Sequence, residues 1–153
     1  MNKTAEYRFT IIVPLYNEKD NLQRLGQSLA SYAARSTAGP TGVLFVDDGS
    51  TDSGGGLLAA MCADNPCFHY LRFTHNCGLS AALKAGFDHC ESPLVGYIDA
   101  DLQTDPEDFD LLLPYLVTDT PVTKEWLAGL GNGGLCLNCP VCHFPNCGFG
   151  KGA

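Results

Sequence analysis

Short apolar runs alternate with amphipathic stretches along most of this chain. The runs are TIIVPLY (10–16), GVLFV (42–46), FHYLRF (68–73) and LVGYI (94–98), and their length and β-branched and aromatic content predict buried strands. Between the runs, apolar residues recur at helical spacing, as at Leu22, Leu25 and Leu29. Four alternations of strand and helix predict an α/β fold with a mostly parallel sheet, flanking helices and right-handed crossovers.

Three further helices are predicted between and after these strands. One is centred on Leu57 and Leu58, one runs from Leu79 to His89, and one starts at Pro106. The glycines at positions 54–56 weaken the first of them, because glycine has a low helix propensity.

Polar residues gather where the predicted strands end. Tyr16 and Glu18 follow the first strand, Asp48 the second, and Asp99 and Asp101 the fourth. The carboxyl ends of strands in a doubly wound sheet share one edge, and ligands bind there. Asp99 and Asp101 would project to the same side of an extended backbone and could share a hard divalent cation, which would hold a diphosphate. The plainer alternative is an acidic turn that caps the following helix.

Composition narrows the classes of ligand. The net charge of −8 and the 9 thinly spread basic residues argue against a nucleic-acid surface. The chain has no Gly-x-Gly-x-x-Gly after the first strand and no Gly-Lys-Ser/Thr loop, so it lacks the usual phosphate cradles. An anionic ligand would therefore need a metal ion or backbone donors.

Length, hydropathy and the cysteines near the middle of the chain indicate the number of domains and the cellular compartment. The 153 residues are enough for one domain with a real core. No apolar run approaches the roughly 20 residues that cross a bilayer, and the start lacks a signal-peptide pattern, so a cytoplasmic chain is expected. Cys62, Cys67, Cys77 and Cys90 are scattered, which indicates reduced thiols instead of a disulfide framework.

Four segments in order resemble a known family. IIVPLYNEKDNL, VLFVDDGSTDSG, NCGLSAALKAGF and VGYIDADLQTDPEDF look like the N-terminal motifs of the family 2 glycosyltransferases with the GT-A fold, a Rossmann-like sheet. The resemblance is to the dolichol- and undecaprenyl-phosphate sugar transferases and covers residues 9–117. It implies transfer of a sugar, with inversion, from a UDP- or GDP-sugar to a polyprenyl phosphate or glycan acceptor. It also implies that the full-length relatives act at the cytoplasmic face of a membrane.

The resemblance assigns a nucleotide side of the site. Pro14, Tyr16 and Glu18 would flank the base and the ribose. Val46 and Asp48 would complete the base contact, with Asp48 accepting a hydrogen bond from a ring N–H.

It also assigns a metal side, with Mg²⁺ or Mn²⁺ as the expected cofactor. Asp99 and Ala100 would touch the ribose and the phosphates. Asp101 and Gln103 would present oxygens to the cation, which would offset the charge of the leaving group. Asp99 and Asp101 are the candidate catalytic residues.

Each assignment has a structural rival. Tyr16 could be a core aromatic at a strand end, and Glu18 a first-turn carboxylate favoured by the helix dipole. Ser50 and Asp52 could be N-caps only, and Asp47 is expected to brace its loop.

The resemblance stops near Thr118, which divides the chain into residues 1–117 and an atypical tail, 118–153. The stretch 120–153 has seven glycines, four cysteines and three charges, and we expect it to be irregular and poorly ordered. A shifted reading frame or a truncated chain would account for it. Alternatively, the tail cysteines bind zinc or an iron–sulfur cluster in a non-catalytic metal or thiol protein; they are Cys136, Cys139, Cys142 and Cys147. Without an acceptor half, exposed sheet surface should favour self-association.

Overall fold

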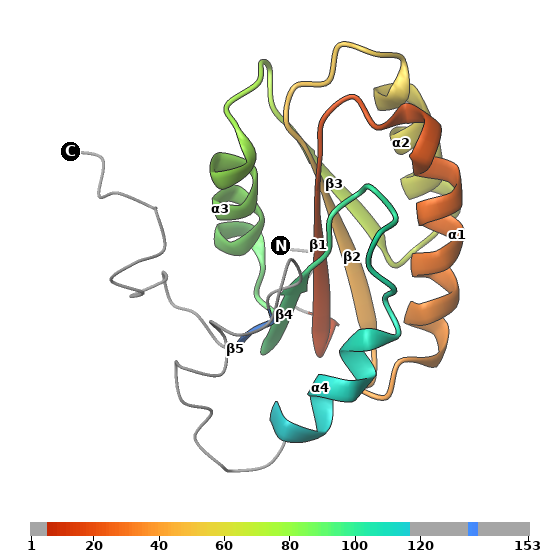
Figure 1. Ribbon diagram of the computed structural model, residues 1–153, viewed down its shortest axis with the longest axis vertical. Helices are drawn as coiled ribbons and strands as arrows, with labels where there is room; N and C mark the ends of the chain where they lie inside the picture. The colour runs from red at the N-terminus through yellow and green to blue at the C-terminus, as the bar shows by residue number, and fades with distance from the viewer. Residues whose placement is uncertain (1–5, 117–134, 138–153) are drawn as a thin grey trace, which may run out of the picture.

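The computed structural model describes residues 6–116 and 135–137. Strands and helices alternate along the first of these ranges (Figure 1). The elements are β1 (Phe9–Leu15), α1 (Lys19–Arg35), β2 (Thr41–Asp47), α2 (Gly54–Asp64), β3 (Phe68–Arg72), α3 (Leu79–His89), β4 (Leu94–Tyr97), α4 (Asp108–Leu116) and β5 (Leu135–Leu137).

These strands form one sheet in the order β3-β2-β1-β4-β5. β1 pairs in parallel with β2 and β4, and β2 pairs in parallel with β3. The carboxyl ends of the parallel strands therefore point the same way. The α/β fold with a mostly parallel sheet and flanking helices is confirmed.

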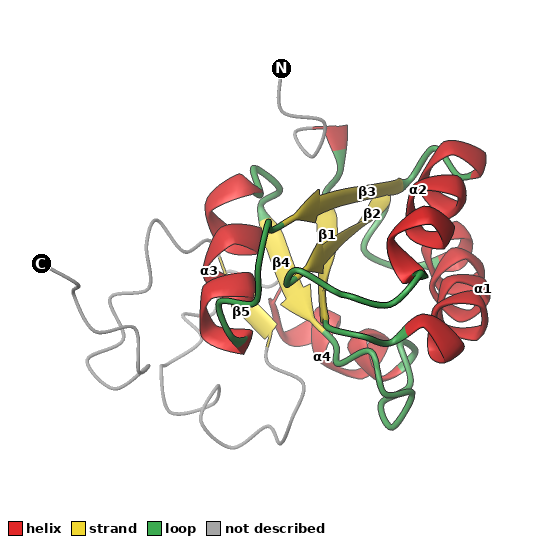
Figure 2. Cartoon of the chain, turned by 90° about the horizontal axis from the view of Figure 1, so that it is seen from above, coloured by secondary structure: helices red, strands yellow, loops and turns green. Residues whose placement is uncertain are grey.

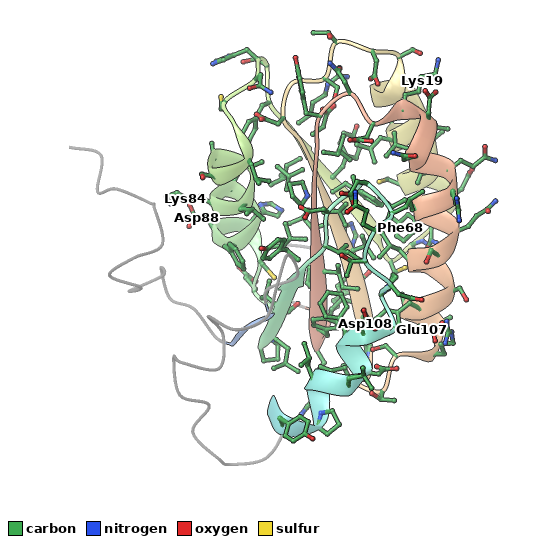
Figure 3. All side chains as sticks on the ribbon, viewed as in Figure 1. Lys19, Phe68, Lys84, Asp88, Glu107 and Asp108 are labelled. Atoms are coloured by element: carbon green, nitrogen blue, oxygen red, sulfur yellow. The ribbon has the colours of Figure 1, made fainter. Side chains whose placement is uncertain are left out.

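Helices cover both faces of this sheet (Figure 2). Alternate residues of β1 separate the two faces, because successive side chains of a strand point to opposite sides. Ile11 and Val13 join a core cluster with residues of α1, α2 and α4, such as Leu29, whereas Ile12 packs in a smaller cluster with Ala82 of α3. On the outer side of α3, Lys84 and Asp88 form an ion pair one turn apart (Figure 3).

Polar contacts tie α4 to the carboxyl end of α1. The hydroxyl of Tyr32 donates to Asp110 Oδ1 at 2.9 Å, and Thr37 Oγ1 donates to the same oxygen at 3.0 Å. Arg35 forms an ion pair with Glu107, which Figure 3 shows just before α4. These contacts hold the far end of the loop that follows β4.

Two boundaries differ from the sequence-based expectation. α4 begins at Asp108, two residues after Pro106, and the turn that leads into it is closed by Asp105, whose Oδ1 accepts the N–H of Glu107 and whose carbonyl accepts that of Asp108. Within the tail that we expected to be irregular, Leu135–Leu137 pairs antiparallel with Leu94–Gly96. An open strand edge has unpaired N–H and C=O groups, and an apolar segment can satisfy them.

The other tail predictions lie outside the described residues, since Cys139, Cys142 and Cys147 fall in 138–153. Among the helices that the structure describes, none has both the length and the apolar character that crossing a membrane requires.

Candidate functional site at the carboxyl ends of the strands

The loops that follow β1 and β2 are joined by the side chain of Asn17. Its Oδ1 accepts the N–H groups of Thr51 and Asp52 at 2.8 and 3.2 Å. The N–H of Asn17 donates to Ser50 Oγ at 2.9 Å. Asn17 has a φ of +55°, a left-handed conformation that asparagine adopts more readily than most residues. The two loops therefore hold each other in place.

Asp52 supports the beginnings of two helices. Its Oδ2 lies 3.1 Å from the backbone nitrogen of Lys19 at the start of α1 and accepts that N–H; Figure 3 labels Lys19. Its Oδ1 accepts the N–H of Gly54 at 2.9 Å, at the start of α2. The first N–H groups of a helix lack intrahelical partners, so this carboxylate satisfies one donor from each helix. Asp52 thus caps the N-terminus of α2, which follows it in the chain, and also that of α1.

Asp48 joins the β2 loop to the loop that follows β3. Its side chain is buried, and its two oxygens accept the N–H groups of Cys77 at 2.7 Å and Gly78 at 2.8 Å. The next residue, Gly49, has a φ of +72° and packs directly against the loop that follows β3: a Cβ at this position would lie 2.7 Å from the backbone nitrogen of Asn76. Each carboxylate oxygen has a second lone pair, so Asp48 retains acceptor capacity for a ring N–H.

Asp47 braces the turn beneath Asp48, as the sequence indicated. The residue is 0% exposed, and its Oδ1 accepts the N–H of Ser50 at 2.8 Å. Its Oδ2 lies 3.2 Å from Nε of Arg72 on β3. No pattern in the sequence singled out Arg72 as part of the site. The signal for it was available only through the sheet register, which places Asp47 directly opposite Arg72.

The metal side of the site is held differently. β4 ends at Tyr97, and Ala100 and Asp101 lie in a turn, so the expected extended backbone through the two carboxylates is wrong. Asp101 Oδ1 accepts the N–H of Gln103 at 3.0 Å. Aspartate side chains often stabilise a turn by bonding to the backbone two residues further on. Burial raises the pKa of Asp99, and the nearby charge of Asp101 raises it further.

A divalent cation fits this loop only if the substrate phosphates coordinate it together with the protein side chains. In residues 6–116 and 135–137, no three His, Cys, Asp or Glu side chains converge on a metal position. Asp101 and Gln103 are exposed and offer oxygens, and Asp99 lies beside them partly buried. Mg²⁺ is usually bound by one or two carboxylates together with waters and substrate phosphates, and this donor set matches that pattern.

The other predicted residues occupy three different environments. Pro14 and Val46 are buried cross-strand partners, and Val46 packs beneath α3, so its side chain does not face solvent. Ala100 is also buried. Tyr16 is 43% exposed, which excludes the core-aromatic alternative for it. Glu18 accepts a hydrogen bond from Asn21 Nδ2 at 2.7 Å and lies just before α1.

Comparison with known proteins agrees with this arrangement. Residues 10–126 match the family model described as glycosyl transferase family 2. The chain is 37% identical over 106 residues to an undecaprenyl-phosphate 4-deoxy-4-formamido-L-arabinose transferase of Pseudomonas fluorescens, covering 68% of this chain and 31% of the relative. It is 33% identical over 117 residues to the enzyme of the same name from Sodalis glossinidius, covering 75% and 35%. The chain thus spans about a third of the length of these relatives.

Solved structures show the same fold. A mannosyltransferase from Pyrobaculum calidifontis, in complex with GDP-Man and Mn²⁺, superposes with a TM-score of 0.64 at 24% identity, over 78% of this chain and 35% of that one. TarS of S. aureus, in complex with UDP-GlcNAc, superposes with a TM-score of 0.60 at 22% identity, over 71% and 31%. By its family match and its fold, the chain belongs to the family 2 glycosyltransferases.

Proposed function

We propose that this chain is the donor-binding part of a glycosyltransferase that transfers a sugar from a UDP- or GDP-sugar to a polyprenyl phosphate, with Mg²⁺ or Mn²⁺ at Asp99–Ala100–Asp101. The observation that carries the proposal is that Asp48, Asp99 and Asp101 all follow the carboxyl ends of parallel strands, at one edge of the sheet, in a chain of this family. The two solved neighbours hold GDP-Man with Mn²⁺ and UDP-GlcNAc. The acceptor is inferred from the names of the relatives.

The nucleotide would lie over the joined loops. Tyr16 is an exposed aromatic ring at the end of β1 and is suited to contact a base or ribose. Asp48 would accept the ring N–H with its remaining lone pairs, and Glu18 would line the neighbouring loop, while Pro14 is buried near the end of β1. Because the side chain of Val46 is buried, its contact with the base would use the backbone.

The diphosphate would lie at the β4 loop. Asp99 and Ala100 would approach the ribose and the first phosphate, and Asp101 and Gln103 would hold the cation. When bound, the cation offsets the negative charge of the nucleoside diphosphate as it leaves. Burial is the main cause of the raised pKa of Asp99, and the charge of Asp101 adds to it; a cation bound here would offset the repulsion between the two carboxylates.

The reaction would need little proton transfer. The acceptor phosphate is already anionic, so its oxygen can attack the anomeric carbon without a strong general base. The new carbon–oxygen bond would form as the bond to the donor diphosphate breaks on the opposite face, which gives inversion. Transfer itself would belong to the complete protein.

Calorimetric titration of the chain with UDP and with GDP, each with Mn²⁺ and with EDTA, tests donor binding. We expect one nucleotide to bind in Mn²⁺ only, and Asp101→Asn to abolish that binding. Asp105→Asn is the matched control, since it removes the same charge from the same loop and keeps the oxygen that accepts the N–H of Glu107. No binding of either nucleotide, or equal losses in the two variants, would contradict the proposal.

The alternative of a metal or thiol protein rests on a cysteine cluster that lies largely outside the described residues. Zinc or iron bound in stoichiometric amount by the chain, with no nucleotide binding, would favour it.

A further inference from the structure

We propose that Arg72 is a positioning residue of the donor site, which holds the 47–50 turn in the shape that binds the nucleotide base. Four features of the described residues support this role. They are the burial of Asp47, the register of β2 and β3, the contacts that the guanidinium makes to both ends of the turn, and the space left for it at Gly55. The inference rests on the proposed function, because the readout is nucleotide affinity.

A buried carboxylate requires a partner. Asp47 is 0% exposed, and a charge in that environment is costly unless it is paired and hydrogen-bonded. Its Oδ1 accepts the N–H of Ser50, and its Oδ2 has no hydrogen bond but lies 3.2 Å from Nε of Arg72. Arg72 therefore supplies the positive charge that pairs with the buried side chain of Asp47.

The sheet brings Arg72 to this position. Asp47 and Arg72 are direct neighbours in the parallel ladder, and Phe73 donates its N–H to the carbonyl of Asp47 at 2.8 Å. Neighbouring residues on adjacent strands have their side chains close together. The pairing is thus set by backbone register and not by a long, freely moving side chain.

Arg72 also contacts the far end of the same turn. Its Nη2 donates to the carbonyl of Ser50 at 3.3 Å, while its Nε faces Asp47. One rigid guanidinium therefore connects the first and the last residue of the turn, and Asp48 and Gly49 lie between them. A lysine has a single ammonium on a flexible stem and cannot reproduce this planar, two-ended contact.

Gly55, in the first turn of α2, leaves room for this side chain. A Cβ at Gly55 would lie 2.7 Å from Cζ of Arg72, closer than side chains normally approach. Glycine at this position weakens the helix by about 1 kcal/mol relative to alanine. Helix formation does not explain a glycine at position 55, but the close approach of Arg72 does, because a larger residue would collide with the guanidinium.

The test uses Arg72→Gln, Arg72→Lys and Gly55→Ala in the whole chain, with Arg24→Gln on the exposed face of α1 as the control for loss of one positive charge. Two quantities are measured for each: the hydrogen-exchange protection of the Ser50 amide in the free protein, and the Kd for the nucleoside diphosphate that the native chain binds.

We expect Arg72→Gln and Gly55→Ala to lower Ser50 protection and to raise Kd by the same factor, about tenfold, since a site that is competent one tenth of the time binds about tenfold more weakly. Arg72→Lys should fall between native and Arg72→Gln, and Arg24→Gln should match the native chain. Gly55→Ala keeps every charge, so it remains informative if Arg72→Gln does not fold.

Native Kd in Arg72→Gln or, should that variant not fold, in Gly55→Ala would overturn the inference, as would equal loss of protection in core amides such as that of Phe45. If the native chain binds no nucleotide, the proposed function fails, and Ser50 protection alone then decides whether Arg72 holds the turn.

Discussion

Asn17 is the residue whose substitution should most clearly reveal the joined loops. Asn17→Ala removes the acceptor of two backbone N–H groups, those of Thr51 and Asp52 at 2.8 and 3.2 Å. In an exposed loop each such bond is worth about 0.5–1 kcal/mol. The φ of +55° adds about 1 kcal/mol of strain for alanine. We therefore expect the free energy of unfolding to fall by about 2–3 kcal/mol.

Two companion variants separate the contributions of hydrogen bonding and backbone strain. Asn17→Gly loses the hydrogen bonds but relieves the strain, so a loss of about 1–2 kcal/mol is expected. Asn17→Asp keeps an acceptor and tolerates the left-handed conformation, so it should stay within about 0.5 kcal/mol of the native chain.

The assay is urea unfolding followed by far-UV circular dichroism, with the slope m compared between variants to confirm that only stability has changed. For a domain of this size, the alanine variant should also lower Tm by about 10 °C. Native stability in Asn17→Ala would refute the interlocking of the two loops. An aspartate variant as unstable as the alanine variant would show that the acceptor oxygen is not what matters.

Three further predictions concern the metal loop, the α1–α4 contact and the sheet surface. Asp99→Asn should be more stable than the native chain at pH 7, because the raised pKa of Asp99 means that its charged form disfavours folding. At about pH 3 the carboxyl is protonated and the difference in stability should vanish. Lower stability of the variant at pH 7 would count against this reasoning. Tyr32→Phe should lose about 1 kcal/mol in urea unfolding through its bond to Asp110, and an unchanged midpoint would show that this bond is not stabilising. Sedimentation velocity should detect dimers or larger species, whereas a monomer with a cooperative melt would argue against exposed apolar surface.

Much of the site could be placed from the sequence because parallel strands share a polarity. The apolar runs that end at Tyr16, Val46 and Ile98 predicted strands, and alternation with helices predicted that their carboxyl ends share one edge. Each of these inferences uses residues that are close together in the chain.

The contacts that hold the site could not be obtained in the same way. Asp99 and Asp101 were expected on an extended backbone, but Asp101 accepts the N–H of Gln103 and the chain turns there instead. Side-chain-to-backbone bonds of this kind compete with strand pairing, and hydrophobic periodicity does not record them.

What the sequence determined by itself is the set of elements from β1 to α4, their order and the edge at which polar residues collect, because hydrophobic periodicity and turn residues act over a few neighbouring positions. Only the tertiary structure decided which loops bind each other. Asp48 reaches Cys77 and Gly78, 29 and 30 residues further on, and Asp47 meets Arg72 through the register of two strands. Register and loop packing are set by the burial of whole strand faces, so the pairing of these side chains follows from the folded sheet and is not encoded in any local pattern.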